Sequence, residues 1–352
     1  MDQRSTRRFL HNIAENDVLR FRLEDPLDGA TMLSVADMLR YIEEASVRIQ
    51  SREDLGPFIG RMVVHFISSS NALAGLSIST ASNTTKLLQN VSRSVPKVTK
   101  DSVVNMKAAM DHAYKTFCGT WTPNSTERGK FSVAPIRVEM ILEIHRLIMN
   151  GELHARQTRD HTEVMNMRLT ASDHHEQGID PPTGEMGIAG LQAICDKVST
   201  LIYPLVGGEV SEAAALFTAQ EVVKLSAWVH FMLLDLHAFQ DGNGRVARLV
   251  GNYLLMTLSP FPIPIFFLET TESFAAQRSR YIEALGQARR DSRGAPVDLT
   301  LMLLDNMCRC FFRCSLPADG EKLAADKLDE AVHDFILSES KSSAVNSSPT
   351  LE

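Results

Sequence analysis

The amino-acid sequence predicts an all-α fold, and three observations lead to that prediction. Apolar residues recur every three to four positions in most segments between residues 33 and 312, which is the period of an amphipathic helix. Turns rich in glycine, proline, serine and asparagine separate these segments. With 352 residues, 44% of them hydrophobic, the chain is long enough to bury one large core or two modest ones.

The helical patterns follow one another along the chain. Residues 33–69 hold two of them and predict a small N-terminal helical lobe, whereas residues 78–95 are rich in Ser, Thr and Asn and predict a linker. Residues 119–132 contain Gly, Pro, Asn and Ser and predict a loop. Further helices are predicted at residues 100–117, 138–149, 188–206, 211–236, 245–258, 273–290, 299–312 and 321–337. The polar, Ser-rich residues 338–352 predict a disordered tail.

Charge and composition argue against a nucleic-acid-binding protein and against a membrane or secreted protein. The formal net charge is -7 and the pI is near 5.9, whereas a nucleic-acid-binding surface usually needs a basic patch and a pI above about 9. We therefore expect a small ligand or a protein partner and no nucleic acid. Residues 1–30 contain no apolar run long enough for a signal peptide or a membrane span. This predicts a soluble, cytoplasmic chain without membrane contact.

The five cysteines form no CxxC pair, and their odd number leaves one unpaired in any disulfide pattern. Reduced thiols are therefore expected. Cys308, Cys310 and Cys314 lie close together and raise the alternative of a metal site. They fall within an apolar helical pattern, however, so core packing is the favoured interpretation.

The residues best suited to catalysis or ligand binding lie in one stretch, 236–248, with the sequence LHAFQDGNGRVAR. Its Gly-Asn-Gly turn separates two predicted helices, and the second helix begins where the glycines end. The unpaired N–H groups and the positive dipole end of that helix favour an anion. Arg245 and Arg248 oppose the dipole at a cost of about 0.3–1 kcal/mol each unless an anion lies nearby. Their spacing of three predicts one shared helix face, which fits a polyphosphate better than a carboxylate.

Asp241 and His237 complete this inventory. A carboxylate beside bound phosphates would repel them, and Mg²⁺, which is typically held by one or two carboxylates plus phosphate oxygens, removes the conflict. His237 ends the preceding predicted helix, and its neutral imidazole can take a proton from an attacking hydroxyl near pH 7. Phe239 is expected to anchor the loop in the core. Taken singly, each feature is more often structural: a helix-end histidine, a turn or a solvated arginine.

Together these residues match all eight fixed positions of the Fic domain signature, His-x-Phe-x-Asp/Glu-Gly-Asn-Gly-Arg-x-x-Arg. Chance agreement is on the order of 10⁻¹⁰ per starting position. The chain thus resembles Fic-type nucleotidyltransferases, which are mostly helical and move AMP from ATP to a hydroxyl side chain of a target protein. Asp241 stands where the Doc-like kinase branch carries Lys, which favours nucleotidyl transfer over phosphate transfer. Ala238 replaces a common Pro at a variable position.

The resemblance implies a role for each motif residue. His237 is the general base, Asp241 holds Mg²⁺, and the phosphates are gripped by Gly242, Asn243, Gly244, Arg245 and Arg248. Residues 138–149 and 281–288 resemble an early and a late core helix of the family, and Tyr281 is a candidate for the base pocket, with a core tyrosine as the alternative. Residues 163–175 correspond to a short β-hairpin flap over the target segment. The flap candidates are Met165, Arg168, Leu169 and His174.

The resemblance also implies domain boundaries and a mode of regulation. An N-terminal helical region is expected at 1–99, a catalytic core at 100–315 with strict limits near 135–290, and a C-terminal helix at 316–337. Within residues 59–76, the family's inhibitory pattern Ser/Thr-x-x-x-Glu-Gly/Asn is matched by Ser70 and Gly75, but Ala74 replaces the Glu. An alanine cannot bridge to Arg248, so autoinhibition through that Glu is expected to be absent. The alternative is an ordinary Ser- and Ala-rich helix end.

The expected partners follow from this resemblance. They are ATP, a protein target bearing a Ser, Thr or Tyr hydroxyl, and a possible second copy of the chain. Two rival functions stay open at this point. The enzyme could transfer another group, such as UMP, phosphate or phosphocholine, or the chain could bind ATP without turnover as a scaffold.

Overall fold

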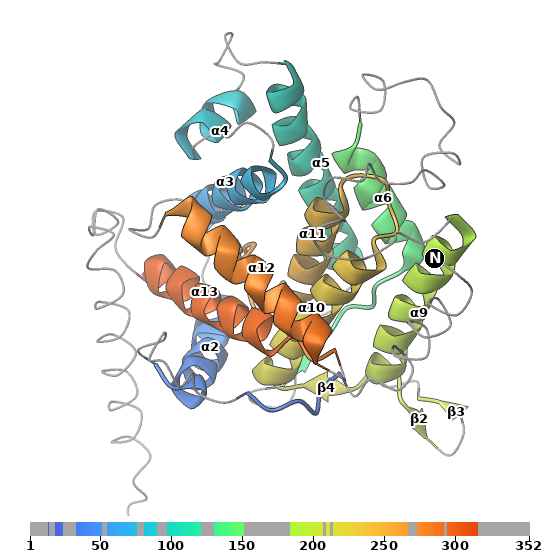
Figure 1. The fold of residues 1–352 in the computed structure, drawn as a ribbon. Coiled ribbons are helices and arrows are strands. Elements are labelled where there is room, and N and C mark those ends of the chain that lie inside the picture. The colour runs from blue at the N-terminus through green and yellow to red at the C-terminus, as the bar shows by residue number, and fades with distance from the viewer. Residues whose placement is uncertain are drawn as a thin grey trace, which may run out of the picture.

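The computed structural model of this chain is mostly helical, which confirms the predicted fold class (Figure 1). It describes residues 13, 18–23, 33–50, 55–75, 81–89, 97–120, 130–150, 184–206, 209–211, 214–266, 273–291 and 294–315. Several predictions fall outside the described residues: the flap at 163–175 with Met165, Arg168, Leu169 and His174, the helix at 321–337 and the tail at 338–352.

Two consecutive helices, α10 (Ala219–Leu236) and α11 (Asn243–Leu255), pack against each other at the centre of the fold. Most of their residues are buried on every side, as is typical of core helices. The prediction that α10 begins at residue 211 was wrong. Thr218 and Glu221 form a capping box that starts the helix at Ala219, with Glu221 accepting the Thr218 N–H at 2.8 Å.

Other helices surround this central pair. α5 (Lys97–Thr120) and α6 (Val138–Ile148) pack on α11, and α9 (Gly184–Ile202) packs on α10. α12 (Phe274–Arg290) and α13 (Val297–Ser315) lie side by side in Figure 1, and α13 also contacts α10. The predictions of these helices were confirmed to within a few residues at each end.

The N-terminal helices join the same core. α2 (Val35–Gln50) packs on α13, and α3 (Gly56–Leu73) packs on α5 and α11. The prediction of a linker at residues 78–95 was wrong in part, because α4 (Ala81–Leu88) lies within it. Its Ser- and Thr-rich composition concealed a buried face, in which Thr84 and Leu87 pack inward and Thr84 Oγ1 accepts the Ser68 hydroxyl at 2.8 Å.

The short strands add two small antiparallel pairs. β1 (Phe131–Ser132) pairs with β4 (Leu216–Phe217), so the end of the predicted 119–132 loop and the residues just before α10 are extended. β2 (Leu205–Val206) pairs with β3 (Glu209–Val210), which ends the helix predicted at 188–206 four residues early.

The N-terminal segment is tied to the first half of α10 by Lys224. This lysine is 5% exposed, and its Nζ donates to the carbonyl oxygens of Leu19 and Phe21 at 3.1 and 2.6 Å. The Phe21 ring lies 4.9 Å from the same Nζ. Burial lowers the pKa of Lys224, and Glu221 opposes that shift.

The cysteines are free thiols, and Cys118 is the exposed one. Cys308, Cys310 and Cys314 are buried in α13, which confirms the prediction of core packing. Burial raises the pKa of Cys195 to about 12, so this thiol stays protonated at neutral pH. Across the described ranges, no helix combines the length and apolar character needed to span a bilayer.

Candidate active site

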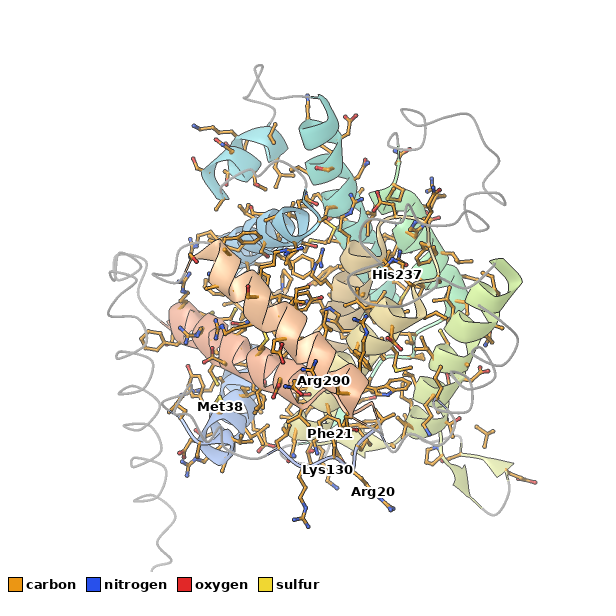
Figure 2. All side chains as sticks on the ribbon, viewed as in Figure 1. Arg20, Phe21, Met38, Lys130, His237 and Arg290 are labelled. Atoms are coloured by element: carbon orange, nitrogen blue, oxygen red, sulfur yellow. The ribbon has the colours of Figure 1, made fainter. Side chains whose placement is uncertain are left out.

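The loop between α10 and α11 carries the residues that the sequence predicts to do chemistry. α10 ends at Leu236, and His237 follows with φ 51° and ψ 50°, in the left-handed region. No other non-glycine residue of the described ranges has a positive φ. This conformation costs about 1–2 kcal/mol for a residue with a Cβ, and strain of this kind clusters at functional sites. Figure 2 labels His237 near the middle of the molecule, to the right, and Phe21 below it.

The His237 imidazole is oriented by the end of its own helix. Its Nδ1 lies 3.3 Å from the Leu234 carbonyl oxygen. A carbonyl oxygen can only accept, so Nδ1 carries the proton in this contact, and in a neutral ring Nε2 then carries the lone pair. The side chain is half-buried. A proton acceptor therefore stands at the mouth of the loop.

The loop is closed by Asn243 and held from outside by α6. The Asn243 side chain accepts the Phe239 N–H at 3.0 Å and donates to the Phe239 carbonyl at 2.6 Å. Phe239 is buried, as predicted, and its ring stacks on that of His145 with centroids 3.9 Å apart. His145 Nε2 donates to the Asp241 carbonyl oxygen at 3.0 Å. The Asn243 side chain thus fastens the loop, and its N–H lies in the first turn of α11.

Two glycines make room at the start of α11. Gly242 has φ 82°, which other residues rarely adopt, and a Cβ there would lie 2.9 Å from the Met149 sulfur, so a side chain at this position would be strained and would displace Met149. A Cβ on Gly244 would lie 3.0 Å from Arg248 Nη1. The hydrogen bonds within the helix begin with the Val246 N–H donating to Gly242 at 2.9 Å. The N–H groups of residues 243–245 come before it, at the positive end of the helix dipole.

The two motif arginines leave α11 in different directions, although their spacing predicted one shared face. Arg245 is 2% exposed, and its Nη2 donates at 3.3 Å to the sulfur of Met149, the C-cap residue of α6. Arg248 is 4% exposed and turns toward α3. Its Nε donates to the Ser70 hydroxyl and its Nη2 to the Ser70 carbonyl, both at 2.8 Å. Burial lowers the pKa of Arg248, a hydrogen bond with Tyr281 opposes the shift, and the neighbouring Arg245 charge adds to it.

Tyr281 reaches this guanidinium from α12. Its hydroxyl is bonded to Arg248 and lies 2.8 Å from His230 Nε2. The side chain is 3% exposed, and its ring packs edge-on against Phe266. No exposed ring face supports the prediction of a base-pocket role. The alternative considered for this residue, a core tyrosine, fits its burial.

Asp241 is exposed at the tip of the loop, and its Oδ1 accepts the Gly242 N–H at 2.6 Å. Over the residues that the structure covers, no group of three or more His, Cys, Asp or Glu side chains is arranged to hold a metal. Mg²⁺ does not need such a group, because one or two carboxylates with phosphate oxygens and waters suffice. The exposed Asp241 carboxylate, beside the N-terminal end of α11, therefore fits a magnesium ion that arrives with phosphates.

The end of α3 carries the predicted regulatory residues. Ser70 is buried against Arg248, whereas Ala74 is the exposed C-cap residue of the helix. Gly75 follows with φ 69°, the left-handed conformation in which many helices end. Residues 70 and 74 are one helical turn apart and share a face. A longer side chain at position 74 would therefore begin on the face that meets Arg248.

Sequence reasoning did not identify three residues that support the site: His145 on α6, Met149 at the C-cap of α6, and His230 on α10. Their common signal is a polar or sulfur-bearing side chain within a strongly apolar helix. That signal is weak, because most such residues are ordinary parts of a core. Their function here depends on which loop or arginine faces them in the tertiary structure.

Comparison with known proteins finds similarity over the segment that contains this loop. Residues 135–255 match the model of the Fic/DOC family. Protein adenylyltransferase fic-1 of Caenorhabditis briggsae is 28% identical over an alignment of 158 residues that covers 37% of this chain and 31% of that protein. A Fido domain-containing protein of Dictyostelium discoideum is 34% identical over 67 residues, or 19% of this chain and 41% of that protein. The chain thus spans about a third to two fifths of the length of these curated relatives.

Solved structures share the fold. Residues 134–508 of Fic-1 from C. elegans are 19% identical, cover 78% of this chain and 71% of their own, and superpose with a TM-score of 0.51. A Fic family protein from Desulfovibrio desulfuricans G20 is 14% identical, with coverage of 91% and 90% and a TM-score of 0.54. At such identities the likeness concerns the fold alone.

Proposed function

We propose a function from the domain identity: residues 135–255 of this chain form a Fic/DOC domain. In our proposal this domain is a protein adenylyltransferase that moves AMP from ATP to a Ser, Thr or Tyr hydroxyl of a target protein. One observation carries the proposal. A single loop joins a proton acceptor at the end of α10 to the N–H groups and the buried arginines at the start of α11. The adenylyltransferase name of the C. briggsae relative favours AMP as the transferred group.

The argument for phosphate rests on the charge of Arg248. Among the residues that the structure describes, its three partners, the Ser70 hydroxyl, the Ser70 carbonyl and the Tyr281 hydroxyl, are all neutral. Holding a guanidinium away from water costs several kcal/mol unless an anion compensates it. Phosphate oxygens match the planar donor edges of arginine and form strong charge-assisted hydrogen bonds with them. A triphosphate along the start of α11 would supply the missing negative charge.

The argument for transfer rests on His237. The target hydroxyl oxygen attacks the α-phosphorus of ATP, its O–H proton passes to Nε2 of His237, and the bond from the α-phosphorus to the bridging oxygen breaks. Pyrophosphate leaves with the electron pair of that bond. General bases of this type contribute about 10²–10⁴-fold to a rate. The arginines and the N–H groups of α11 contribute by positioning the phosphates and by neutralising charge.

Asp241 is the residue that we assign to magnesium. When bound, the ion supplies charge neutralisation between this carboxylate and the phosphate oxygens. The hydrogen bond from the Gly242 N–H and the bond from His145 to the Asp241 carbonyl hold the residue at the tip of the loop. The rigid loop thus keeps the carboxylate beside the start of α11.

The regulatory part of the proposal concerns Ala74. Without a carboxylate at this position, α3 meets Arg248 through neutral groups only, and ATP does not have to displace an ion pair. We therefore propose an enzyme that is active without release of an inhibitory glutamate. A homodimer stays a possible assembly within this proposal.

Radiolabelled ATP tests the proposal directly. Purified chain is incubated with magnesium and a protein extract, in parallel reactions with ATP labelled at the α- or the γ-phosphate. We expect protein-bound label from α-labelled ATP only, and its loss in His237→Ala while calorimetry still detects ATP binding. Label retained from the γ-position would indicate a kinase, and label from UTP or CDP-choline alone would indicate another transferred group. ATP binding with no transfer in the wild-type chain would favour the scaffold.

A further inference from the structure

Besides α3, which contributes Ser70, three helices supply side chains around the Arg248 guanidinium. α11 carries Arg248 itself, α12 contributes Tyr281, and α10 contributes His230. Their exposed fractions are 4%, 3% and 1%, so water does not compete for the contacts among them. The Tyr281 hydroxyl is bonded to Arg248 on one side and lies 2.8 Å from His230 Nε2 on the other. The three side chains form one continuous polar chain in an otherwise apolar part of the core.

The direction of each hydrogen bond in this chain is fixed. A guanidinium has only donors, so the Tyr281 oxygen accepts from Arg248. The single O–H of Tyr281 then points to His230 Nε2, which must be the acceptor of a neutral ring. Burial, followed by the Arg248 charge, lowers the pKa of His230 to about 3, in agreement with a neutral ring at pH 7.

Because the Tyr281 hydroxyl is neutral, it affects Arg248 differently from an acidic side chain. A carboxylate in place of the Tyr281 hydroxyl would form an ion pair with Arg248 and compete with any phosphate. The phenol orients the guanidinium and leaves its charge available. Gly244 contributes from the other side, because its missing Cβ lets Arg248 Nη1 approach the first turn of α11.

We propose that Tyr281 and His230 are positioning residues that hold Arg248 in the orientation that receives the triphosphate, and that neither residue touches the nucleotide. The inference rests on the proposed function, since it assigns these residues to the same phosphate site. It also replaces the expected contact of Tyr281 with the base by a contact at the phosphate end. His230 acts through Tyr281, and Tyr281 acts through Arg248.

Calorimetric titration with three ligands tests the proposal without measuring activity. The probes are Mg·ATP, magnesium tripolyphosphate and adenosine. In Tyr281→Phe, we expect Kd to rise about tenfold for ATP and for tripolyphosphate, as for loss of a hydrogen bond to a charged group, and to stay unchanged for adenosine. Tyr253→Phe is the matched control, because this buried tyrosine donates to the Pro135 carbonyl at 3.4 Å, away from Arg248. It should bind all three ligands like the wild type.

A double-mutant cycle separates positioning from general destabilisation. With Arg248→Ala present, Tyr281→Phe should cause no further loss of tripolyphosphate affinity, because the group that it positions is gone. An equal loss in both backgrounds, or a loss confined to adenosine, would overturn the proposal. So would an unchanged Kd in Tyr281→Phe when the wild type binds well. A wild-type chain that binds neither ATP nor tripolyphosphate would overturn the proposed function as well.

A second pair of variants covers the case in which Tyr281→Phe does not fold. His230→Leu removes the acceptor of the Tyr281 proton, whereas His230→Gln retains an acceptor at similar length. We expect about a fivefold to tenfold rise of the tripolyphosphate Kd with Leu and rescue with Gln. Equal affinities in the two variants would contradict the role of His230, and thermal unfolding shows that each protein is folded.

Discussion

The first turns of α10 carry a helix cap and an anchored lysine, whereas its last turn leads into backbone strain and a buried arginine whose described partners are neutral. At the start, Thr218 and Glu221 cap the helix and Lys224 fastens the carbonyls of residues 19 and 21. At the end, His237 adopts a left-handed conformation. Arg248, in the helix that follows the loop, is bonded to neutral groups. The contacts at the start of α10 thus stabilise the fold, whereas the conformation at its end costs free energy.

This difference indicates why the candidate active site lies at the end of α10 and not at its start. Strain and a buried charge persist only when the surrounding structure holds them in place. His145, Asn243 and Phe239 provide that support around the loop. The capped and anchored first half of α10 lies far along the same helix and contributes stability instead. Variants at the two ends should therefore separate activity from stability.

His237→Gly should give the largest effect and the clearest separation. We expect transfer to fall by about 10²–10⁴-fold, because the base is lost. We also expect the free energy of unfolding to rise by about 1 kcal/mol, since glycine adopts the left-handed conformation without steric cost. Urea unfolding and the α-label assay measure the two quantities. His237→Ala is the matched control, which should lose the same activity without gaining stability, and equal stability of both variants would contradict the assigned strain.

Ala74→Glu should have the second largest effect. A carboxylate on the α3 face that meets Arg248 would form a charge-assisted bond worth about 1.5–3 kcal/mol and compete with phosphate. We expect ATP affinity and labelling to fall about tenfold to a hundredfold. Ala74→Gln has the same length without the charge and should stay close to wild type. Equal labelling in Ala74→Glu and wild type would mean that the end of α3 does not act on Arg248 in this way.

Thr218→Ala should have the smallest effect and leave the chemistry alone. Loss of the capping hydrogen bond is expected to lower the free energy of unfolding by about 1 kcal/mol. The Michaelis constant for ATP should not change, because the cap lies at the opposite end of α10 from His237. Thr218→Ser retains the hydroxyl and should retain the stability. A changed Michaelis constant in Thr218→Ala would show that the two ends are coupled.

The sequence predicted the helices best where apolar residues recur without interruption. α6, α12 and α13 lie within two to three residues of their predicted limits at each end. The prediction failed where composition imitates a linker, as in α4, whose buried face consists of Thr84 and Leu87. It also placed the start of α10 too early, because helical spacing continued through residues that pair with β1 instead. Such pairing depends on a partner strand more than eighty residues away along the chain.

For the candidate site, the sequence identified the motif residues but not all of their contacts. Asn243 was expected on the phosphates, yet its side chain closes the loop on Phe239. Tyr281 was considered for the base pocket, yet its hydroxyl faces Arg248 and His230. Position along the chain cannot reveal which partner a buried polar side chain will meet. Only the packing of α3, α10 and α12 around Arg248 decides it.

The sequence by itself determined the helical class and the residues of the motif, because periodicity and short-range spacing are local properties of a chain. The tertiary structure decided that Arg248 meets Ser70 and Tyr281, which lie 178 and 33 positions away from it, and that Tyr281 in turn meets His230. The physical reason is burial. Once α3 and α12 exclude water from the guanidinium, its hydrogen bonds must go to whatever the neighbouring helices present, and no local pattern specifies those neighbours.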